Sequence, residues 1–197
     1  NRLSMPQKNY KKNYHKNCQI LAKEHPDWLI RSQNADTTGM ELIPTVSGEL
    51  SLRRTYQGKT YSYHSQESPL QETKDWFTNL PLSPEIDTLF VYGMGLGYAF
   101  AAAKVWLETD PKRALLFLEQ DPALLDVWLH TPLAKEILQH PQVRLVLFET
   151  LEERLFLEEL SWQRHSSHPL FPALPLYEQR NSQGVRQLKE RLLHAIS

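Results

Sequence analysis

Glycine residues follow a short apolar run near the middle of the chain, at a spacing that suits a ligand-binding turn. Leu89–Tyr92 leads into Gly93, Gly95 and Gly97, and an alanine-rich segment comes next. Glycine lacks a Cβ and accepts positive φ, so the backbone can approach a ligand closely. N–H groups at the start of a following helix favour an anion at that point. These residues predict a pocket, but they do not include a recognisable catalyst.

A carboxylate ends the next apolar run. Glu119 follows Ala114–Leu118 and lies about 20 residues beyond the last glycine of the turn, where an acid can accept hydrogen bonds from ribose hydroxyls. The order strand, glycine turn, helix, strand and acid is typical of a Rossmann-like nucleotide site. The predicted cofactor-binding residues are therefore Gly93, Gly95, Gly97 and Glu119, and the candidate cofactors are a nucleotide sugar or S-adenosylmethionine.

The glycine spacing departs from the dinucleotide fingerprint G-x-G-x-x-G. A third glycine would be needed at Tyr98 or at Phe100, and the spacing present is G-x-G-x-G. That spacing is closer to S-adenosylmethionine-dependent methyltransferases, in which an acid after the second strand holds the ribose. The alternative is a tight turn that binds nothing, with Tyr98 or Phe100 filling the space, as expected of a protein-interaction module.

Other polar residues give weaker signals. Asp121 and Glu149 follow predicted strands, but a carboxylate at a strand end more often caps the next helix. His165 and His168 lack a third ligand at a supporting spacing, so we expect no metal site. No phosphate-binding loop, G-x-S-x-G motif or paired-carboxylate motif is present, and the catalytic residues stay unknown.

Composition excludes some classes of protein. The chain has 197 residues, 41% hydrophobic and 23% charged, and a formal net charge of −1. These values fit a globular protein and give no reason to expect nucleic acid or an anionic membrane as partner. The single cysteine, Cys18, and the lack of a signal peptide or an uninterrupted apolar span indicate a cytoplasmic protein. The start at Asn1 and the amphipathic end, 185–196, suggest a fragment of a longer protein.

Periodicity divides the chain into two predicted parts. In residues 1–85 we expect a helix over 7–25, an antiparallel β meander over 40–46, 50–55 and 60–64, and a linker helix. Ser68 and Gln71 can form the capping box of that linker helix, with Pro69 at its first position. Residues 86–197 alternate strands with helices, which predicts a mostly parallel, Rossmann-like sheet flanked by helices.

The expected elements of the second part follow from the same patterns. The predicted strands are 89–92, 114–118 and 143–148, and the predicted helices are 98–108, 121–130, 133–140 and 150–160, the last with a capping box from Thr150 to Glu153. We expect 165–175, with its three prolines, to be a loop. The fold class is therefore α/β, with an N-terminal helix and a small antiparallel meander before the Rossmann-like part.

Two segments together resemble one protein family. Residues 63–72, YHSQESPLQE, are similar to the HS-x-x-x-P-x-x-E segment near the N-terminus of the motility accessory factors. These are bacterial glycosyltransferases associated with flagellin glycosylation, with domain of unknown function 115. Residues 91–98, VYGMGLGY, and 118–122, LEQDP, resemble the family's glycine turn and second strand, and His25–Trp28 also fits. Thr73 departs from the pattern, which usually has a small residue there.

The resemblance covers most of residues 10–130 and implies an N-terminal domain. The family's sugar-transfer centre is expected in a following central domain, so no catalytic residue is carried over. The resemblance implies an accessory role with a Rossmann-like, vestigial nucleotide pocket, in which Gly93, Gly95, Gly97 and Glu119 are the matching turn and acid. The implied partners are an acceptor protein, flagellin-like in the family, and a downstream transferase domain of the same chain.

Overall fold

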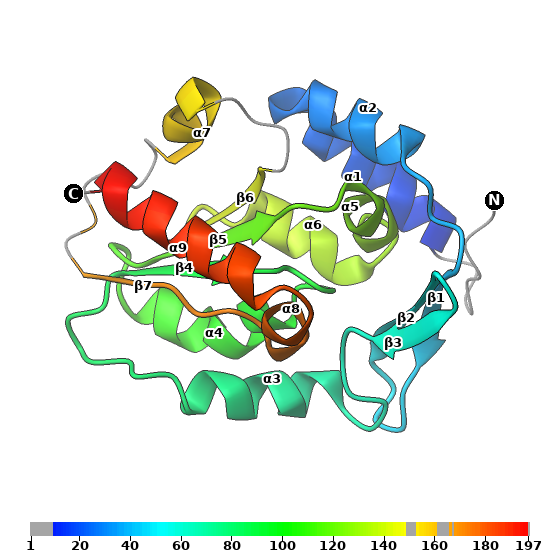
Figure 1. Cartoon of the computed structure of the whole chain (residues 1–197), viewed down its shortest axis with the longest axis horizontal. Helices are drawn as coiled ribbons and strands as arrows, with labels where there is room; N and C mark the ends of the chain where they lie inside the picture. Colours follow the sequence, from blue (N-terminus) through cyan, green and yellow to red (C-terminus); the bar gives the residue numbers. More distant parts are fainter. Residues whose placement is uncertain (1–9, 149–152, 161–165, 167, 197) are drawn as a thin grey trace. The chain divides into compact units, whose positions relative to one another are not determined.

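The computed structural model describes residues 10–148, 153–160, 166 and 168–196 (Figure 1). The described residues form two compact units, each continued by several segments of the chain. The first unit holds the residues up to Asn79 together with Gly95–Ala103 and Asp121–His140. The second unit holds Leu80–Met94, Lys104–Gln120 and the residues from Pro141 onward. A domain boundary between residues 85 and 86 stays a prediction.

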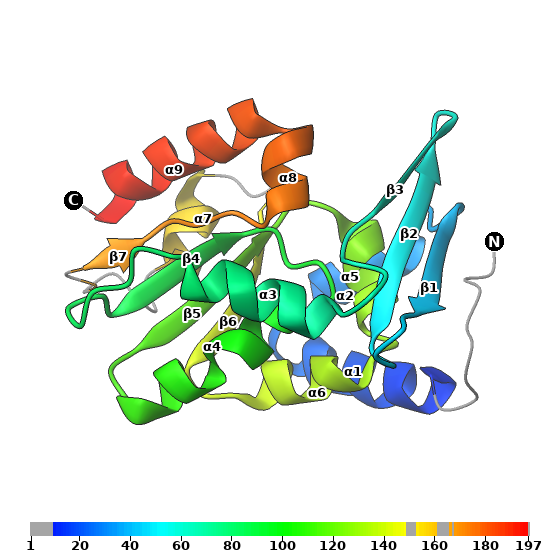
Figure 2. The same cartoon turned by 90° about the horizontal axis from the view of Figure 1, so that it is seen from below.

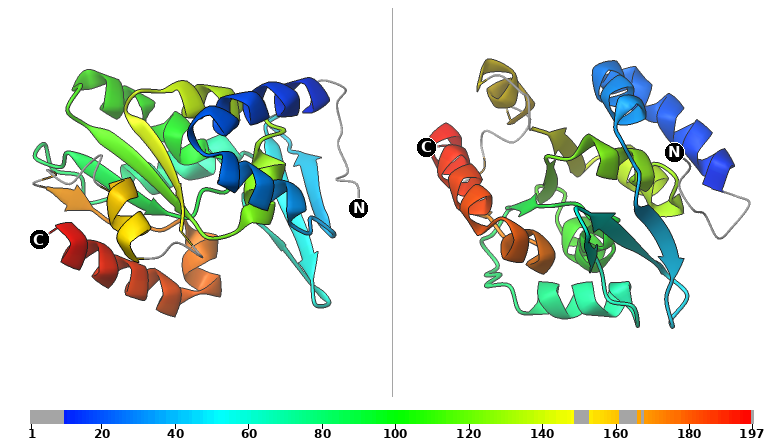
Figure 3. Two further views of the ribbon diagram at one scale, coloured as in Figure 1. Left: turned by 90° about the horizontal axis from the view of Figure 1, so that it is seen from above. Right: turned by 45° about the vertical axis from the view of Figure 1, so that its right-hand side comes forward.

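The first unit combines helices with a small antiparallel sheet. Its elements are α1 (Tyr10–Glu24), α2 (Pro26–Asn34), β1 (Met40–Pro44), β2 (Leu50–Tyr56), β3 (Lys59–Ser62), α3 (Pro69–Thr78), α5 (Pro122–Trp128) and α6 (Pro132–Gln139). The strand order is β1-β2-β3, and every pairing in it is antiparallel, which confirms the predicted meander (Figure 2). Helix α1 packs against α6 and α2 packs against α5 (Figure 3).

The helix predicted over residues 7–25 is followed directly by a second one. Helix α1 ends at Glu24, as expected from the proline at position 26, and residues 7–9 lie outside the described residues. Pro26 is then the first residue of α2, a position that its fixed φ and missing N–H suit. The proline thus both ends one helix and starts the next, and the sequence reasoning anticipated only the first effect.

Side-chain caps at helix starts agree only in part with the prediction. Ser68 Oγ accepts the N–H of Gln71 at 3.2 Å, so Ser68 is the N-cap of α3. No hydrogen bond from the Ser68 N–H to the Gln71 side chain completes the capping box among the described residues, and the Gln71 amide nitrogen donates to Asp75. Asp121 caps α5 by accepting the N–H of Ala123, as the more ordinary interpretation of that carboxylate predicts.

The second unit is built on a four-stranded parallel sheet in the order β6-β5-β4-β7. The strands are β4 (Thr88–Tyr92), β5 (Ala114–Glu119), β6 (Val143–Leu147) and β7 (Pro169–Leu170). Every residue of β4 and β5 is buried, which matches their uninterrupted apolar composition and the usual position of parallel strands between two covered faces. Helix α4 (Tyr98–Thr109) begins in the first unit and ends in the second. The molecule is therefore α/β and Rossmann-like, as predicted.

One face of this sheet packs on helices from the C-terminal third of the chain. These helices are α7 (Glu153–Leu160), α8 (Pro175–Arg180) and α9 (Ser182–Ile196). Alternate residues of β4 and β5, including Phe90 and Leu116, form one core with Phe156 of α7 and Leu192 of α9. Both α7 and α9 lie over the same face (Figures 2 and 3). This packing gives the sheet a covered face of the kind that the apolar strands require.

The segment predicted as a proline-rich loop contains regular structure. Pro169 and Leu170 pair in parallel with Thr88 and Leu89, and α8 starts at Pro175. Proline lacks one backbone donor but still fits the short edge strand of a sheet. The expected capping box at Thr150–Glu153 involves residues 150–152, which lie outside the described residues, as does Glu149. Within the described ranges, no helix has the length and apolar composition that a membrane span requires.

Candidate functional site

The glycine turn joins β4 to α4, at the carboxyl end of the sheet where folds of this class bind ligands. Its glycines all have positive φ: 92° at Gly93, 52° at Gly95 and 91° at Gly97. A side chain at any of these positions would be strained. The chain crosses from the second unit to the first between Met94 and Gly95, so each unit holds one half of the turn.

In the first half of the turn, Glu119 interacts with groups of its own unit. Its Oε1 atom accepts the N–H of Met94 at 3.0 Å and the hydroxyl of Tyr177 at 2.5 Å, and its Oε2 atom accepts the N–H of Gln120 at 3.0 Å. The Glu119 side chain is 1% exposed. The carboxylate that was predicted to hold a ribose therefore already has protein donors on both oxygens.

Tyr177 also fills the space beside Gly93. A Cβ built on Gly93 would lie 2.4 to 2.6 Å from carbon atoms of the Tyr177 ring. The N–H of Gly93 donates to the carbonyl oxygen of Leu118 at 2.8 Å. The turn is thus closed by an aromatic side chain, as expected for the interaction-module alternative, but the residue is Tyr177 of α8 rather than Tyr98 or Phe100.

In the second half of the turn, the backbone is held by a buried histidine. The N–H of Leu96 donates to His64 Nε2 at 2.9 Å, so Nε2 carries no proton and the neutral ring has its proton on Nδ1. Burial lowers the pKa of His64 to about 3, which keeps the imidazole neutral in the folded protein. Tyr98 packs edge-on against this ring, with centroids 4.9 Å apart.

Hydrogen bonds to neighbouring residues hold the segment around His64 in place. Glu72 Oε1 accepts the N–H of Ser65 at 3.1 Å and lies 3.9 Å from His64 Nδ1. Ser68, on the same segment, is the N-cap of α3. Thr73, which departs from the family pattern, is 3% exposed and its hydroxyl donates to the carbonyl oxygen of Pro69. The HS-x-x-x-P-x-x-E segment and the G-L-G-Y turn therefore form one hydrogen-bonded structure inside the first unit.

Gly97 has a packing role of its own. A Cβ at this position would lie 2.5 Å from Ile137 Cδ1 and 3.2 Å from Trp128 Nε1. The close approach of α5 and α6 side chains therefore accounts for this glycine without a ligand. Tyr98 hydrogen-bonds the carbonyl oxygen of Leu50 at 2.5 Å, and Phe100 is fully buried.

The remaining predicted candidates do not assemble into a second centre. Asp121 pairs with Arg54 at 2.5 Å while it caps α5. Across the described residues, no three His, Cys, Asp or Glu side chains converge in a way that could hold a metal, and His165 lies outside that part of the chain. Sequence reasoning missed Tyr177 altogether, since no motif marks it. His64 was part of a motif, but nothing in the motif indicated its partner.

Comparison with known proteins adds little to this geometry. Neither a protein-family model nor a curated protein matches the chain. Among solved structures, the crystal structure of MNMC2 from Aquifex aeolicus is similar over 77% of this chain, with 20% sequence identity and a TM-score of 0.33. The present chain spans 57% of the length of that structure.

Proposed function

We propose that this chain is the N-terminal accessory domain of a bacterial protein glycosyltransferase of the motility accessory factor type. In this proposal its Rossmann-like glycine turn is a structural element and not a cofactor site. The family part rests on the resemblance of residues 63–72 and 91–98. It is supported by the hydrogen bond between His64 and Leu96, because that bond joins the two segments that make the resemblance specific.

The observation that carries the accessory role is the position of Tyr177. A nucleoside bound at a turn of this kind needs room beside the first glycine and a carboxylate to receive its ribose hydroxyls. The Tyr177 ring takes the room beside Gly93, and its hydroxyl takes Glu119 Oε1. In this arrangement the side chain stands where the nucleoside would be, and the former nucleotide pocket is vestigial.

The proposed role is to recruit or orient an acceptor protein for a transferase domain located further along the same polypeptide. The family resemblance makes a flagellin-like acceptor the first to test. Sugar transfer itself is assigned to that later domain, so no residue of this chain is given a catalytic role. A gene that encodes this chain without any downstream transferase domain would contradict the proposal.

The direct experiment is a thermal-shift panel on the 197-residue chain with S-adenosylmethionine, nucleotide sugars and plain nucleotides. A ligand at 100 times its Kd adds about 2.7 kcal/mol to the unfolding free energy, which corresponds to roughly 5–11 °C for a chain of this size. We expect no shift, because Tyr177 and His64 hold the turn. A saturable shift with any of these ligands in the wild-type chain would overturn the accessory role.

A methyltransferase is the second candidate, and one contact favours it. Glu119 accepts a hydroxyl from Tyr177, which is the type of hydrogen bond that a ribose hydroxyl would make. An S-adenosylmethionine-binding state would require Tyr177 to leave the turn. Under this candidate the wild-type chain binds S-adenosylmethionine, and Glu119→Ala weakens that binding by about 1–3 kcal/mol. Unchanged affinity in the variant would remove this candidate.

A further inference from the structure

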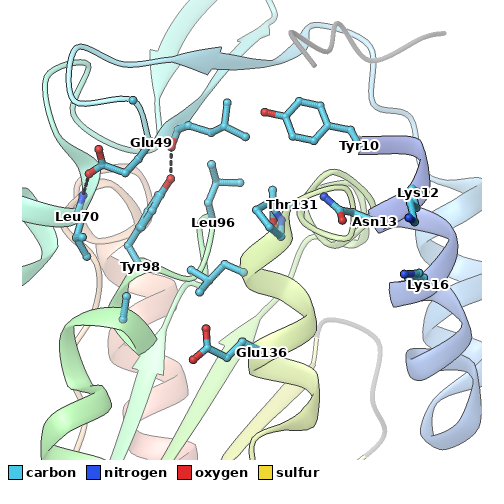
Figure 4. A pocket seen from close by; sticks show the side chains of 15 residues that line it. Tyr10, Lys12, Asn13, Lys16, Glu49, Leu70, Leu96, Tyr98, Thr131 and Glu136 are labelled. Carbon is cyan, nitrogen blue, oxygen red and sulfur yellow. Dashed lines mark hydrogen bonds between the residues drawn. The ribbon is translucent and has the colours of Figure 1, made fainter. Parts of the chain in front are cut away.

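A sizeable pocket lies within the first unit and involves neither Glu119 nor Tyr177. Its volume is about 810 Å³, which falls within the range of small-molecule sites. Its walls come from α1, from the turn between β1 and β2, from the start of α4 and from the start of α6 (Figure 4). Because all of these segments belong to the first unit, the pocket is a property of that unit alone.

Part of the inner surface of the pocket is apolar. Leu50, Leu96 and Leu133 contribute to it from three different segments, and Leu96 is 1% exposed. Leu96 is also held in place by the hydrogen bond from its N–H to His64. A preformed apolar wall of this kind suits a hydrocarbon body, since burying apolar surface favours binding.

The charged groups around the pocket differ in what they already bind. The carboxylate of Glu49 accepts hydrogen bonds from Ser47, Ser68 and the N–H of Leu70, and the bond from Ser47 is the main reason why the pKa of Glu49 is lowered. Glu136 also has an interaction of its own. The carboxylate of Glu49 is therefore engaged with the protein, and Glu136 is not without a partner.

The positive groups are not engaged in this way. Lys12 and Lys16 lie one turn apart on α1, with Asn13 beside them, and all three line the pocket. Among the described residues neither lysine has an ion-pair partner, and Asn13 has no hydrogen-bond partner. Figure 4 shows these side chains along α1, across the cavity from Glu49 and Tyr98. Donors left for a ligand on the α1 wall thus include two ammonium groups and an amide.

We propose that this pocket binds a small amphipathic anion, with its carboxylate or phosphate head held by Lys12, Asn13 and Lys16 and its apolar body against Leu50, Leu96 and Leu133. The charge pattern favours an anion over a cation, because the available charged groups are positive. The apolar wall favours a ligand with a hydrocarbon body over inorganic phosphate or acetate. This inference does not depend on the proposed accessory function, and either can fail without the other.

Calorimetric titration of the 197-residue chain tests the ligand class. The probes are octanoate, octyl phosphate, octyl glucoside and octyltrimethylammonium, each below its micellar concentration, with acetate and inorganic phosphate as head groups alone. We expect saturable one-to-one binding of the octyl anions, about tenfold weaker binding of the neutral probe, and no binding of the cation or the free head groups. The relative affinity of octanoate and octyl phosphate identifies the preferred head. Equal binding of neutral and anionic probes, or no binding of either octyl anion, would overturn the proposal.

Paired variants test the location of the site. Lys12→Gln with Lys16→Gln should weaken binding of the octyl anions about tenfold and leave octyl glucoside unchanged. The matched control, Lys11→Gln with Lys23→Gln, removes the same charge from the same helix at positions that do not line the pocket. An equal loss in both double variants would show a long-range charge effect and contradict a specific site.

A second pair keeps the test independent of charge. Ala101 lines the pocket on α4 and its neighbour Ala102 does not. Ala101→Trp should fill part of the cavity and abolish binding of the octyl anions, while Ala102→Trp should retain it. Thermal melts of both variants establish that each is folded before titration. Unchanged affinity in folded Ala101→Trp would place any binding elsewhere on the chain and overturn the proposal.

Discussion

His64 is the residue whose chemistry is most sharply defined by its surroundings. It is 5% exposed, and its unprotonated Nε2 accepts the Leu96 N–H. Protonation of the ring would put its second proton on Nε2, which already accepts a hydrogen bond. It would also place a positive charge in a buried site. The carboxylate of Glu72 is 3.9 Å from the other ring nitrogen, but burial has the larger influence and lowers the His64 pKa.

The first prediction concerns the pH dependence of stability. The pKa of His64 is about 3 in the folded chain and ordinarily about 6.5, so the unfolded chain binds the extra proton between these values. Stability from this group is present above pH 6.5 and is lost as the pH falls towards 3. Between pH 7 and pH 5 the wild type should lose about 2 kcal/mol more than His64→Gln, as measured by urea unfolding. If the unfolding free energies of the wild type and His64→Gln changed equally with pH, the low pKa of His64 in the folded chain would be contradicted.

A second prediction concerns the contact between Gly93 and Tyr177. Gly93→Ala should destabilise the chain by about 2–5 kcal/mol, because it adds both backbone strain at positive φ and overlap with the Tyr177 ring. In a Tyr177→Ala background the overlap is gone and only the strain of about 1–2 kcal/mol is expected to remain. Denaturant unfolding of the four proteins gives the coupling between the two positions. If the destabilisations caused by the two substitutions were fully additive, the Tyr177 ring would not restrict the side chain at position 93.

At the scale of the elements, Asp121 links the start of α5 to the small sheet of the first unit. It caps α5 through Ala123 and pairs with Arg54 of β2. Burial has the largest single influence and would lower the pKa of Arg54, but the charge and hydrogen bond of Asp121 together with the contribution of Tyr63 outweigh it, so the pKa is raised. One side chain thus fixes where α5 begins and neutralises a half-buried cation.

The two roles of Asp121 can be separated by substitution. Asp121→Asn keeps a side-chain oxygen for the cap but loses the charge opposite Arg54, whereas Asp121→Ala loses both. We expect the alanine variant to be less stable than the asparagine variant by about 1 kcal/mol, the usual contribution of an N-cap. Asp27→Ala, in the first turn of α2, is the control and should cost only a few tenths of a kcal/mol. Equal stability of the two Asp121 variants would mean that the cap contributes nothing.

The elements that could be predicted are those with strong local signals. Apolar runs and turn residues predict the buried strands and the meander. The caps at Ser68 and Asp121 follow from local hydrogen-bonding chemistry. Strand β7 is only two residues long and has no periodicity to detect. The closure of the glycine turn depends on Tyr177, which is 58 positions from Glu119. Such a contact is set by tertiary packing, so local patterns predicted the turn and the acid but not their occupant.

At the scale of the whole molecule, the lone cysteine is a probe of cooperativity. Cys18 lies on α1 in the first unit and is 8% exposed. Burial raises the pKa of its thiol to about 11, so little thiolate is present near neutral pH. We expect Cys18 to resist a thiol reagent at pH 8 in the folded chain and to react fully in denaturant.

The labelling experiment also separates the two units. If the chain unfolds in one step, Cys18 labelling and the far-ultraviolet circular dichroism signal should share one urea midpoint. Labelling that precedes the loss of the circular dichroism signal would show that the part of the chain around Cys18 opens before the rest. Rapid labelling without denaturant would contradict the burial of Cys18.

The interleaving of the two units along the chain has a consequence for synthesis on the ribosome. The first unit takes its last segment from residues 121–140, where Leu129 and Thr131 supply the carbonyl oxygens that accept from Asn17. The N-terminal helices therefore emerge from the exit tunnel long before their partners. A nascent chain halted at residue 85 would expose the α1 surface that α6 later covers, and could present that surface to a chaperone.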